Sequence, residues 1–250
     1  MDQAATLSEI LHADTLYPAR SKVLEAGCGV GAQTVILARN NPKAKITSVD
    51  LSRESLRAAR ERVASEGFTN VTFRRADILH LPYVDDDFDH VFVCFVLEHL
   101  PNPVDALRCL HRVLKPGGTL TVIEGDHGSA YFHPDSPYAR KTIQCLIDLQ
   151  AGLGGNSRIG RQLYPLLKKA GYRGVRVSPR MIYVDSSRPG LVEGFTKNTF
   201  IAMVQGVKDP AIRSGLLDEA GWKRGIRDLY RTTRGDGTFI YTFFKGIASK

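Results

Sequence analysis

The sequence predicts an α/β fold, built on a doubly wound, mostly parallel sheet of seven strands with helical cap insertions. In residues 1–125, five strand-like segments alternate with helices, which is typical of a doubly wound sheet. Residues 88–95 form a nearly continuous apolar run, typical of a central strand buried on both faces. The last two strand-like segments lie about fifty residues apart, too far for a hairpin turn, which indicates a helical insertion.

The elements of the first half follow from hydrophobic periodicity and from helix breakers. Leu7, Ile10, Leu11 and Leu16 recur near helical spacing, so residues 1–20 are expected to form one amphipathic helix. Further helices are expected at 33–40, between Ser52 and Gly67, and at 105–114. Strands are expected at 22–26, 45–49, 71–75, 88–95 and 119–124.

The second half is expected to complete the sheet and to carry the cap within the same domain. Residues 126–139 are loop-like, being rich in His, Gly, Pro and Tyr. Helices are expected at 140–149, 160–170, 191–204 and 216–230, and strands at 175–184 and 238–245. The predicted organisation is an N-terminal helix (1–20), a nucleotide-binding core (21–125) and a remainder (126–250) whose cap covers about 126–160 and 185–237.

The composition of the 250 residues, 43% hydrophobic and 24% charged, is ordinary for a globular protein. No run of eighteen apolar residues and no charged-then-apolar leader occurs, so a cytoplasmic protein without a membrane partner is expected. The four cysteines are widely spaced and form no CxxC pair. Disulfides and a zinc site are therefore not expected, and no metal is predicted.

A glycine-rich turn follows the first predicted strand and precedes a helix. Such a turn lets the backbone approach a nucleotide at the carboxyl end of the strand. Two templates fit it. The pattern G-x-G-x-x-A at 27–32, with Asp50 about twenty residues later, fits a dinucleotide site. The pattern E-x-G-x-G-x-G at 25–31 fits S-adenosylmethionine (SAM) enzymes instead.

Five motifs in order resemble those of class I SAM-dependent methyltransferases, of the small-molecule kind that includes the ubiquinone/menaquinone C-methyltransferases. They are VLEAGCGVG (23–31), SVDLS (48–52), RRADILHLP (74–82), DDDFDHVFVCFVLEHL (85–100) and RVLKPGGTLTV (112–122). The resemblance covers about 100 residues and implies a Rossmann-like methyltransferase fold with SAM as the cofactor. No residue beyond 125 contributes to a motif of the family.

The resemblance also implies roles for single residues. Asp50 would accept the ribose hydroxyls, Asp77 the adenine amino group, and Glu25 would orient the methionine end of SAM. The full set of implied cofactor-binding residues is Glu25, Gly27, Cys28, Gly29, Gln33, Asp50, Leu51, Asp77, Ile78, Phe95 and His99. The acids suit a cofactor whose sulfonium and ammonium groups are cationic.

The segment after the fifth predicted strand holds the candidate catalytic residues, because ligands lie outside the carboxyl ends of such strands. His127, which titrates near neutral pH, is the first candidate for a base or an acceptor-binding group. His133 and Tyr131 are further candidates. Residues 194–204 of the predicted cap could line an apolar acceptor pocket.

The predicted reaction is an in-line displacement, and its rate depends mainly on the alignment of the acceptor atom with the methyl group of SAM. The acceptor is expected to be a carbon, oxygen or nitrogen atom of a small, partly apolar or anionic metabolite. The fourth predicted strand lacks an Asn/Asp-Pro-Pro-Tyr motif, which disfavours enzymes that methylate planar amino groups in DNA or glutamine. The sequence predicts no oligomeric state.

Three alternatives remain, one of which is a SAM-binding fold without enzyme activity that serves only as a partner module. Residues 1–125 carry 14 Lys/Arg against 16 Asp/Glu, whereas residues 126–250 carry 20 against 10. The basic second half could indicate an RNA methyltransferase, although no compact block of Lys or Arg occurs and a nucleic-acid partner is not favoured. The glycine pattern also leaves open a NAD-dependent oxidoreductase.

Overall fold

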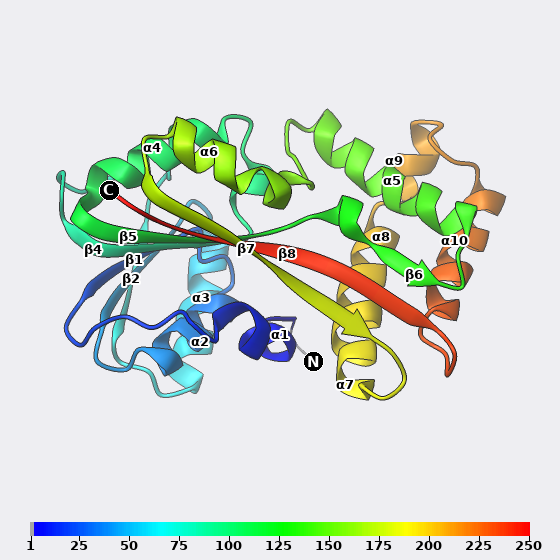
Figure 1. Cartoon of the computed structure of the whole chain (residues 1–250), viewed down its shortest axis with the longest axis horizontal. Coiled ribbons are helices and arrows are strands. Elements are labelled where there is room, and N and C mark those ends of the chain that lie inside the picture. The colour runs from blue at the N-terminus through cyan, green and yellow to red at the C-terminus, as the bar shows by residue number, and fades with distance from the viewer. Residues whose placement is uncertain (1–2) are drawn as a thin grey trace.

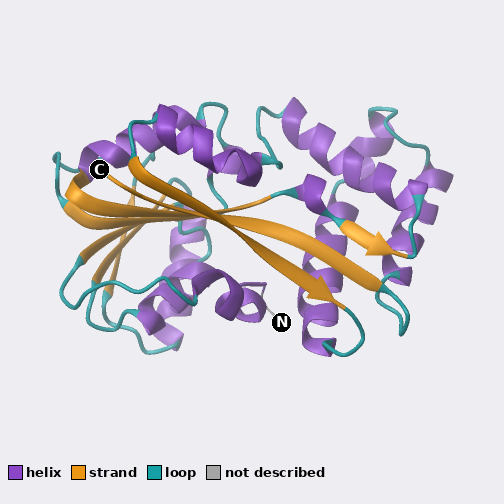
Figure 2. Ribbon diagram, viewed as in Figure 1, coloured by secondary structure: helices purple, strands orange, loops and turns teal. Residues whose placement is uncertain are grey.

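The computed structural model describes residues 3–250, which form a single central sheet with helices on both faces (Figures 1 and 2). The strands follow the order β3-β2-β1-β4-β5-β8-β6, and β7 pairs with the other edge of β8. Their bounds are β1 Lys22–Ala26, β2 Lys45–Asp50, β3 Val71–Arg75, β4 Phe88–Cys94, β5 Leu114–Gly125, β6 Tyr131–His133, β7 Arg173–Val184 and β8 Thr238–Ser249.

Strands β1 to β5 are parallel, so their carboxyl ends meet at one edge of the sheet. In β4, Val91, Phe92 and Val93 are fully buried, because helices cover both faces of this strand. The predicted doubly wound fold is therefore confirmed, with one short strand, β6, beyond the seven that were predicted.

The helices form two layers (Figure 1). One layer contains α1 Gln3–His12, α2 Ala32–Asn40 and α3 Arg53–Ser65, and the other contains α4 Pro103–Val113 and α6 Leu163–Lys169. The remaining helical segments are η1 Leu97–His99, η2 His127–Ser129, α5 Pro137–Gly152, η3 Ile159–Gln162, α7 Pro189–Leu191, η4 Val192–Ile201, α8 Ala202–Gly206, α9 Lys208–Arg213 and α10 Glu219–Arg231. Within residues 3–250, no helix has the length and apolar character needed to cross a membrane.

Strand β8 joins the two halves of the sheet. Its C-terminal half pairs antiparallel with β5, from Thr119↔Ser249 to Gly125↔Phe243. Its N-terminal half pairs with β6, and its other edge pairs with β7 along its whole length. Phe239, Tyr241 and Phe243 alternate along β8 and are all buried on one face, as their spacing of two requires.

Two local predictions were wrong. The predicted helix over 1–20 ends at His12, and residues 1 and 2 lie outside the described part of the chain. Residues 13–20 are not helical because their polar groups bind other elements: the Tyr17 backbone N–H, for example, donates to Asn41 Oδ1 at 2.6 Å. The predicted loop at 126–139 contains the turn η2 and the strand β6, which pairs with β8 through Tyr131↔Ile240.

The predicted helix at 191–204 is part of a continuous helical run over 189–206 whose middle, η4, is a π-helix. The Thr199 hydroxyl donates to the Gly194 carbonyl at 2.8 Å. A Cβ on Gly194 would lie 2.5 Å from Thr6 Oγ1, so glycine allows α1 to pack directly on η4. Helix α1 thus contacts both the cap and α2.

A buried lysine fixes the C-terminal end of α1. The Lys245 side chain on β8 is fully buried, and its ammonium donates to Asp14 Oδ1 at 2.5 Å, Thr15 Oγ1 at 2.6 Å and the Leu11 carbonyl at 3.2 Å. Arg180 of β7 donates to the other Asp14 oxygen at 2.6 Å. These bonds satisfy the buried charge and attach α1 to the second half of the sheet.

We expect Lys245→Met to lower the free energy of unfolding by about 1–3 kcal/mol, because buried acceptors lose their donor. Urea denaturation measures the effect. The control is Lys22→Met, which removes an exposed 2.8 Å pair with Asp87 and should cost less than about 1 kcal/mol. Equal losses in the two variants would show that Lys245 does not anchor α1.

Candidate active site

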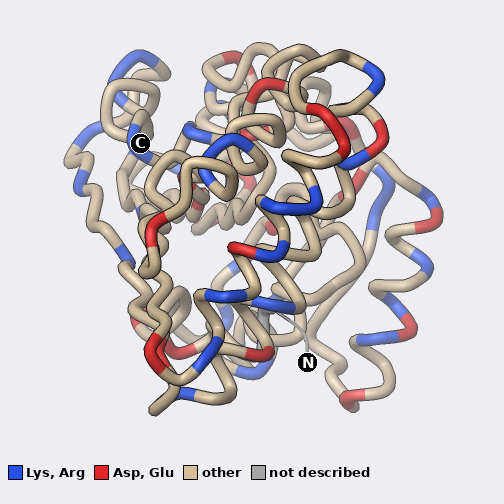
Figure 3. The backbone as a smooth tube through the Cα atoms, turned by 90° about the vertical axis from the view of Figure 1, so that its right-hand side faces the viewer, with Lys and Arg blue, Asp and Glu red and all other residues tan. Residues whose placement is uncertain are grey.

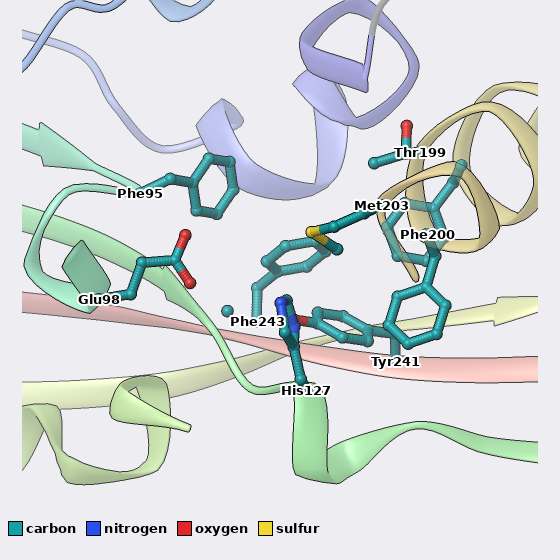
Figure 4. A pocket seen from close by; sticks show the side chains of 10 residues that line it. Phe95, Glu98, His127, Thr199, Phe200, Met203, Tyr241 and Phe243 are labelled. Atoms are coloured by element: carbon teal, nitrogen blue, oxygen red, sulfur yellow. The ribbon is translucent and has the colours of Figure 1, made fainter. Parts of the chain in front are cut away.

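A cavity of about 100 Å³ lies where the carboxyl ends of β4 and β5 meet η4 and the middle of β8 (Figure 4). Its lining is mainly aromatic, and it includes a carboxylate, Glu98, and an imidazole, His127. The residues that line it are Phe95, Glu98, Gly125, His127, Phe195, Thr199, Phe200, Met203, Tyr241 and Phe243. Four of them come from the segment 194–204 that the sequence singled out as a pocket wall.

The glycine turn between β1 and α2 lies beside this cavity. Gly27 has φ of 81°, and a Cβ there would lie 2.4 Å from Val96 Cγ2, so the turn packs closely on the segment after β4. Gly29 has φ of 50°, but nothing lies within 4 Å of its Cβ position. The turn is therefore packed against the protein at Gly27 and open at Gly29.

Two predicted acids border the open side of the turn. Asp50 Oδ2 accepts from the Gly29 backbone N–H at 2.8 Å, and Oδ1 accepts from the Ser52 N–H at 2.9 Å. Asp77 accepts from the Leu79 N–H at 2.9 Å, and this bond and His80 hold its pKa below the ordinary value. Each carboxylate has further lone pairs for a ligand.

Glu25 lies beneath the turn and is buried. Its Oε2 accepts from Thr34 Oγ1 at 2.8 Å and from Ser48 Oγ at 2.6 Å, so it ties β1 to α2 and β2. Burial raises its pKa to about 7, although both hydroxyls oppose the rise. Through its hydrogen bonds with Thr34 and Ser48, Glu25 holds the glycine turn in place.

The other predicted cofactor residues are arranged around the same edge. Cys28 is buried against α3, so the turn presents its backbone there. Gln33 Oε1 lies 2.6 Å from His12 Nε2, which joins α1 to α2. The Leu51 side chain is exposed, Ile78 is half-buried, and His99 Nε2 lies 3.5 Å from Glu98 Oε1.

These residues fit SAM. The open position at Gly29 would admit the cofactor close to the backbone, and a Cβ at that position would fill the space. Asp50 and Asp77 offer acceptors for hydroxyl and amino groups, and their negative charge suits a cationic cofactor. Helix α2 also begins at this turn, at Ala32.

The turn after β4 connects the glycine turn to the cavity. Phe95 has φ of 57°, an uncommon value for a residue with a side chain. Its N–H donates to the Ile123 carbonyl at 2.9 Å, and Glu124 Oε1 accepts from the N–H groups of Val96 and Leu97 at 3.0 and 2.7 Å. These bonds hold the strained residue so that its ring lines the cavity.

His127 lies on the opposite wall. Its Nδ1 is 2.7 Å from Tyr241 Oη, and its backbone N–H donates to the Ser157 carbonyl at 2.8 Å. Burial lowers the pKa of His127 to about 4, so the imidazole is neutral at neutral pH. A Cβ on Gly125 would lie 2.5 Å from Tyr241 Oη, so glycine is what allows this tyrosine to reach the histidine.

The other candidate catalytic residues are not brought into this cavity. Tyr131 and His133 lie on β6 with exposed side chains and do not line it. Arg161, next to this loop, makes a two-pronged bond to buried Asp126 at 2.5 and 2.9 Å. This ion pair fixes the loop that carries His127.

Sequence reasoning missed Tyr241, Phe243 and Glu124 as site residues. The alternation of Phe239, Tyr241 and Phe243 predicted a shared face of the last strand, but not the cavity that this face meets. Glu124 is the penultimate residue of β5, close to the position where ligand-binding groups occur in such sheets.

The Lys and Arg side chains of residues 126–250 are distributed and do not gather in a single basic patch. Figure 3 shows Lys and Arg along α10 and its neighbours, with Asp and Glu between them. Several are in ion pairs, among them Lys223–Glu219 and Arg231–Asp236. This arrangement is that of a solvated surface.

The comparisons with known proteins concern the family and the fold of the chain. Residues 19–176 match a family described as a methyltransferase domain. The methyltransferase GfsG of Streptomyces halstedii is 40% identical over 119 residues, which are 47% of this chain and 42% of GfsG, so less than half of that relative is matched. A demethylmenaquinone methyltransferase of Anoxybacillus flavithermus is 28% identical over 64% of this chain and 73% of its own.

The fold is shared with solved structures of low identity. The [4+2]-cyclase SpnF matches with a TM-score of 0.56 and 21% identity, over 99% of this chain and 80% of its own. A phosphoethanolamine N-methyltransferase of Haemonchus contortus, solved with SAM, matches with a TM-score of 0.59 and 16% identity, over 99% of this chain and 52% of its own. Since the family match covers more than half of the chain and includes the glycine turn and both acids, this chain belongs to the family of SAM-dependent methyltransferases.

Proposed function

We propose that this chain transfers a methyl group from SAM to a small, partly apolar acceptor held in the cavity beside Glu98 and His127. The proposal rests mainly on the two residues that follow β4, Phe95 and Val96. Val96 packs on Gly27 of the glycine turn, while Phe95 lines the cavity. One short turn therefore borders both the cofactor side and the acceptor side, as methyl transfer between two bound molecules requires.

The cofactor residues proposed are those around the open turn. Gly29 would admit SAM, Asp50 would accept the ribose hydroxyls, and Asp77 the adenine amino group. SAM supplies, when bound, a methyl carbon on a cationic sulfur that keeps the electron pair when the bond breaks. The chain's own contribution is alignment and the exclusion of water, and its aromatic walls suit both.

The cavity that we propose for the acceptor has a small volume. The cavity of about 100 Å³ is below the range of roughly 300–1,000 Å³ of most ligand pockets, so it fits the reacting end of an acceptor. The rings of Tyr241 and Phe243, 4.7 Å apart, favour a flat or aromatic group. His127 would hydrogen-bond the acceptor while Tyr241 fixes the imidazole. The relative named for demethylmenaquinone agrees with a ring-bearing acceptor.

The family match favours SAM over NAD as the cofactor. The distributed, paired charges of the second half favour a small molecule over RNA. Whether carbon, oxygen or nitrogen receives the methyl group is decided by the acceptor.

The proposal is tested by incubating the chain with isotopically methyl-labelled SAM and a panel of phenols, quinols, amines and carboxylic acids. We expect label in a ring-bearing member of the panel, identified by mass spectrometry. The Asp50→Ala variant is the negative control. Binding of NADH without binding of SAM in calorimetry would contradict the proposal.

We expect Asp50→Ala to weaken SAM binding by about 1–3 kcal/mol, because the ribose hydroxyls lose their acceptor and the Gly29 N–H loses its partner. Isothermal titration calorimetry gives the affinity. Asp105→Ala, which removes an exposed carboxylate paired with Arg108, should bind SAM as the parent does. Equal affinity of all three proteins would place the cofactor elsewhere.

We expect Tyr241→Phe to reduce turnover of the identified acceptor roughly 3- to 10-fold, because it deletes one hydrogen bond to His127 and keeps the ring. SAM affinity should not change, since Tyr241 lies on the acceptor side. Steady-state kinetics and calorimetry separate the two effects. The control is Tyr183→Phe on β7, outside the cavity. Unchanged turnover in Tyr241→Phe would exclude a role for this bond.

A further inference from the structure

Glu98 is a carboxylate on the wall of the cavity, and the proposed function gives it no role. It lies on η1, directly after the turn that follows β4, and its side chain is 12% exposed. In Figure 4 its carboxylate points toward the cavity, between Phe95 and His127. His99 Nε2 lies 3.5 Å from Glu98 Oε1. Burial raises the pKa of Glu98.

Glu124 is a second carboxyl next to the same turn, and it is completely buried. Its Oε1 accepts from the N–H groups of Val96 and Leu97, the two residues before Glu98. Its Oε2 has no hydrogen-bond partner within residues 3–250. A buried carboxylate oxygen without a partner is costly, and a proton on that oxygen removes most of the cost.

The two carboxyl groups affect each other. Burial raises the pKa of Glu124 to about 8, and the charge of Glu98 adds to the rise. Cys94 on β4 and Tyr241 on β8 interact with both carboxyl groups, His99 on η1 interacts with Glu98, and His127 on η2 lines the same cavity. None of these supplies a strong fixed cation, so two full negative charges at this place are unfavourable.

We propose that Glu98 and Glu124 form a carboxyl pair that holds one proton at neutral pH, with the proton on Glu124 and the charge on Glu98, and that Glu98 takes the proton of the acceptor. This inference rests on the proposed function, because it assigns a step of that reaction. Glu98 is then a catalytic residue, and Glu124 is a positioning residue that fixes the turn and the charge of its neighbour.

His127 is less suited to accept that proton. Its Nδ1 is engaged with Tyr241, and its lowered pKa makes the imidazole a weak base. A base works best when its pKa lies near the working pH, and burial raises the pKa of Glu98 in that direction. His127 remains a hydrogen-bonding group for the acceptor, while Glu98 faces the same space from the other wall.

The assignment restricts the acceptor to molecules whose reacting oxygen or nitrogen carries a hydrogen. A lone pair on that oxygen or nitrogen forms the bond to the methyl carbon, the electron pair of the O–H or N–H bond stays on the same atom, and the proton goes to the Glu98 carboxylate. The carbon–sulfur pair remains on sulfur, so atoms and electrons balance. An acceptor without such a hydrogen, such as a tertiary amine or a thioether, needs no base and would gain nothing from Glu98.

The pair is tested first without any ligand, by following the ¹³C resonances of labelled glutamate carboxyls as a function of pH. Besides Glu25, whose raised titration is assigned by its loss in Glu25→Gln, the free protein should show two glutamates with raised midpoints, the upper one near the value of Glu124. Glu98→Gln should remove the lower titration and move the upper one down by about one pH unit, because the neighbouring charge is lost. Glu124→Gln, which keeps an acceptor for the two N–H groups, should remove the upper titration alone.

The matched control is Glu66→Gln, an exposed carboxylate paired with Arg39, which should leave both raised titrations in place. Thermal melting of each variant confirms that it folds. An upper midpoint that is unchanged in Glu98→Gln, or the absence of any raised glutamate besides Glu25, overturns the pair whether or not methyl transfer has been found.

The catalytic part is tested with the O–H or N–H acceptor from the labelled-SAM panel. Glu98→Gln should lower turnover about 10²- to 10⁴-fold while SAM affinity stays the same. In the unsubstituted protein the rate should rise with pH through the lower midpoint measured by ¹³C, since Glu98 must be ionised to take a proton. Normal turnover in Glu98→Gln overturns the assignment, whereas a panel without any methylated product overturns the proposed function and leaves the ¹³C test of the pair valid.

Discussion

The hydrogen bonds from the N–H groups of Val96 and Leu97 to Glu124 organise both sides of the site. They fix a turn in which Phe95 adopts a left-handed conformation, and such strain persists only where surrounding contacts determine it. Through Val96 the same turn packs on Gly27, and through Phe95 it forms a wall of the cavity. One buried carboxyl group therefore sets the spacing between the glycine turn and the acceptor side.

The first half of the fold could be predicted from the sequence because its signals are local. Parallel strands such as 88–95 are recognisable apolar runs, and the glycine turn needs positive φ at Gly27 and Gly29, both observed. The placement of Asp50 also followed from order along the chain, since parallel strands end at a common edge. Its bond to the Gly29 N–H did not follow, because it depends on the exact shape of the turn.

The second half was harder because its contacts join distant parts of the chain. Tyr241 reaches His127 across 114 residues, and no local pattern specifies that contact. Strand β6 has only three residues, so it shows no periodicity before its pairing with β8 is known. Residues 13–20 lose the predicted helix because Asp14 and Thr15 bind Lys245, a side chain whose burial could not be inferred from its neighbours.

Strand β8 follows every other element in the chain, yet it supplies Tyr241 and Phe243 to the cavity and Lys245 to the anchor of α1. During synthesis, N-terminal segments leave the ribosome first and begin to fold first. The glycine turn and β1 to β5 are therefore available while the partner of β5 is still missing. A nascent chain at that stage has the glycine turn, the proposed cofactor side, but only one wall of the cavity proposed for the acceptor, so the two sides become complete at different times during translation.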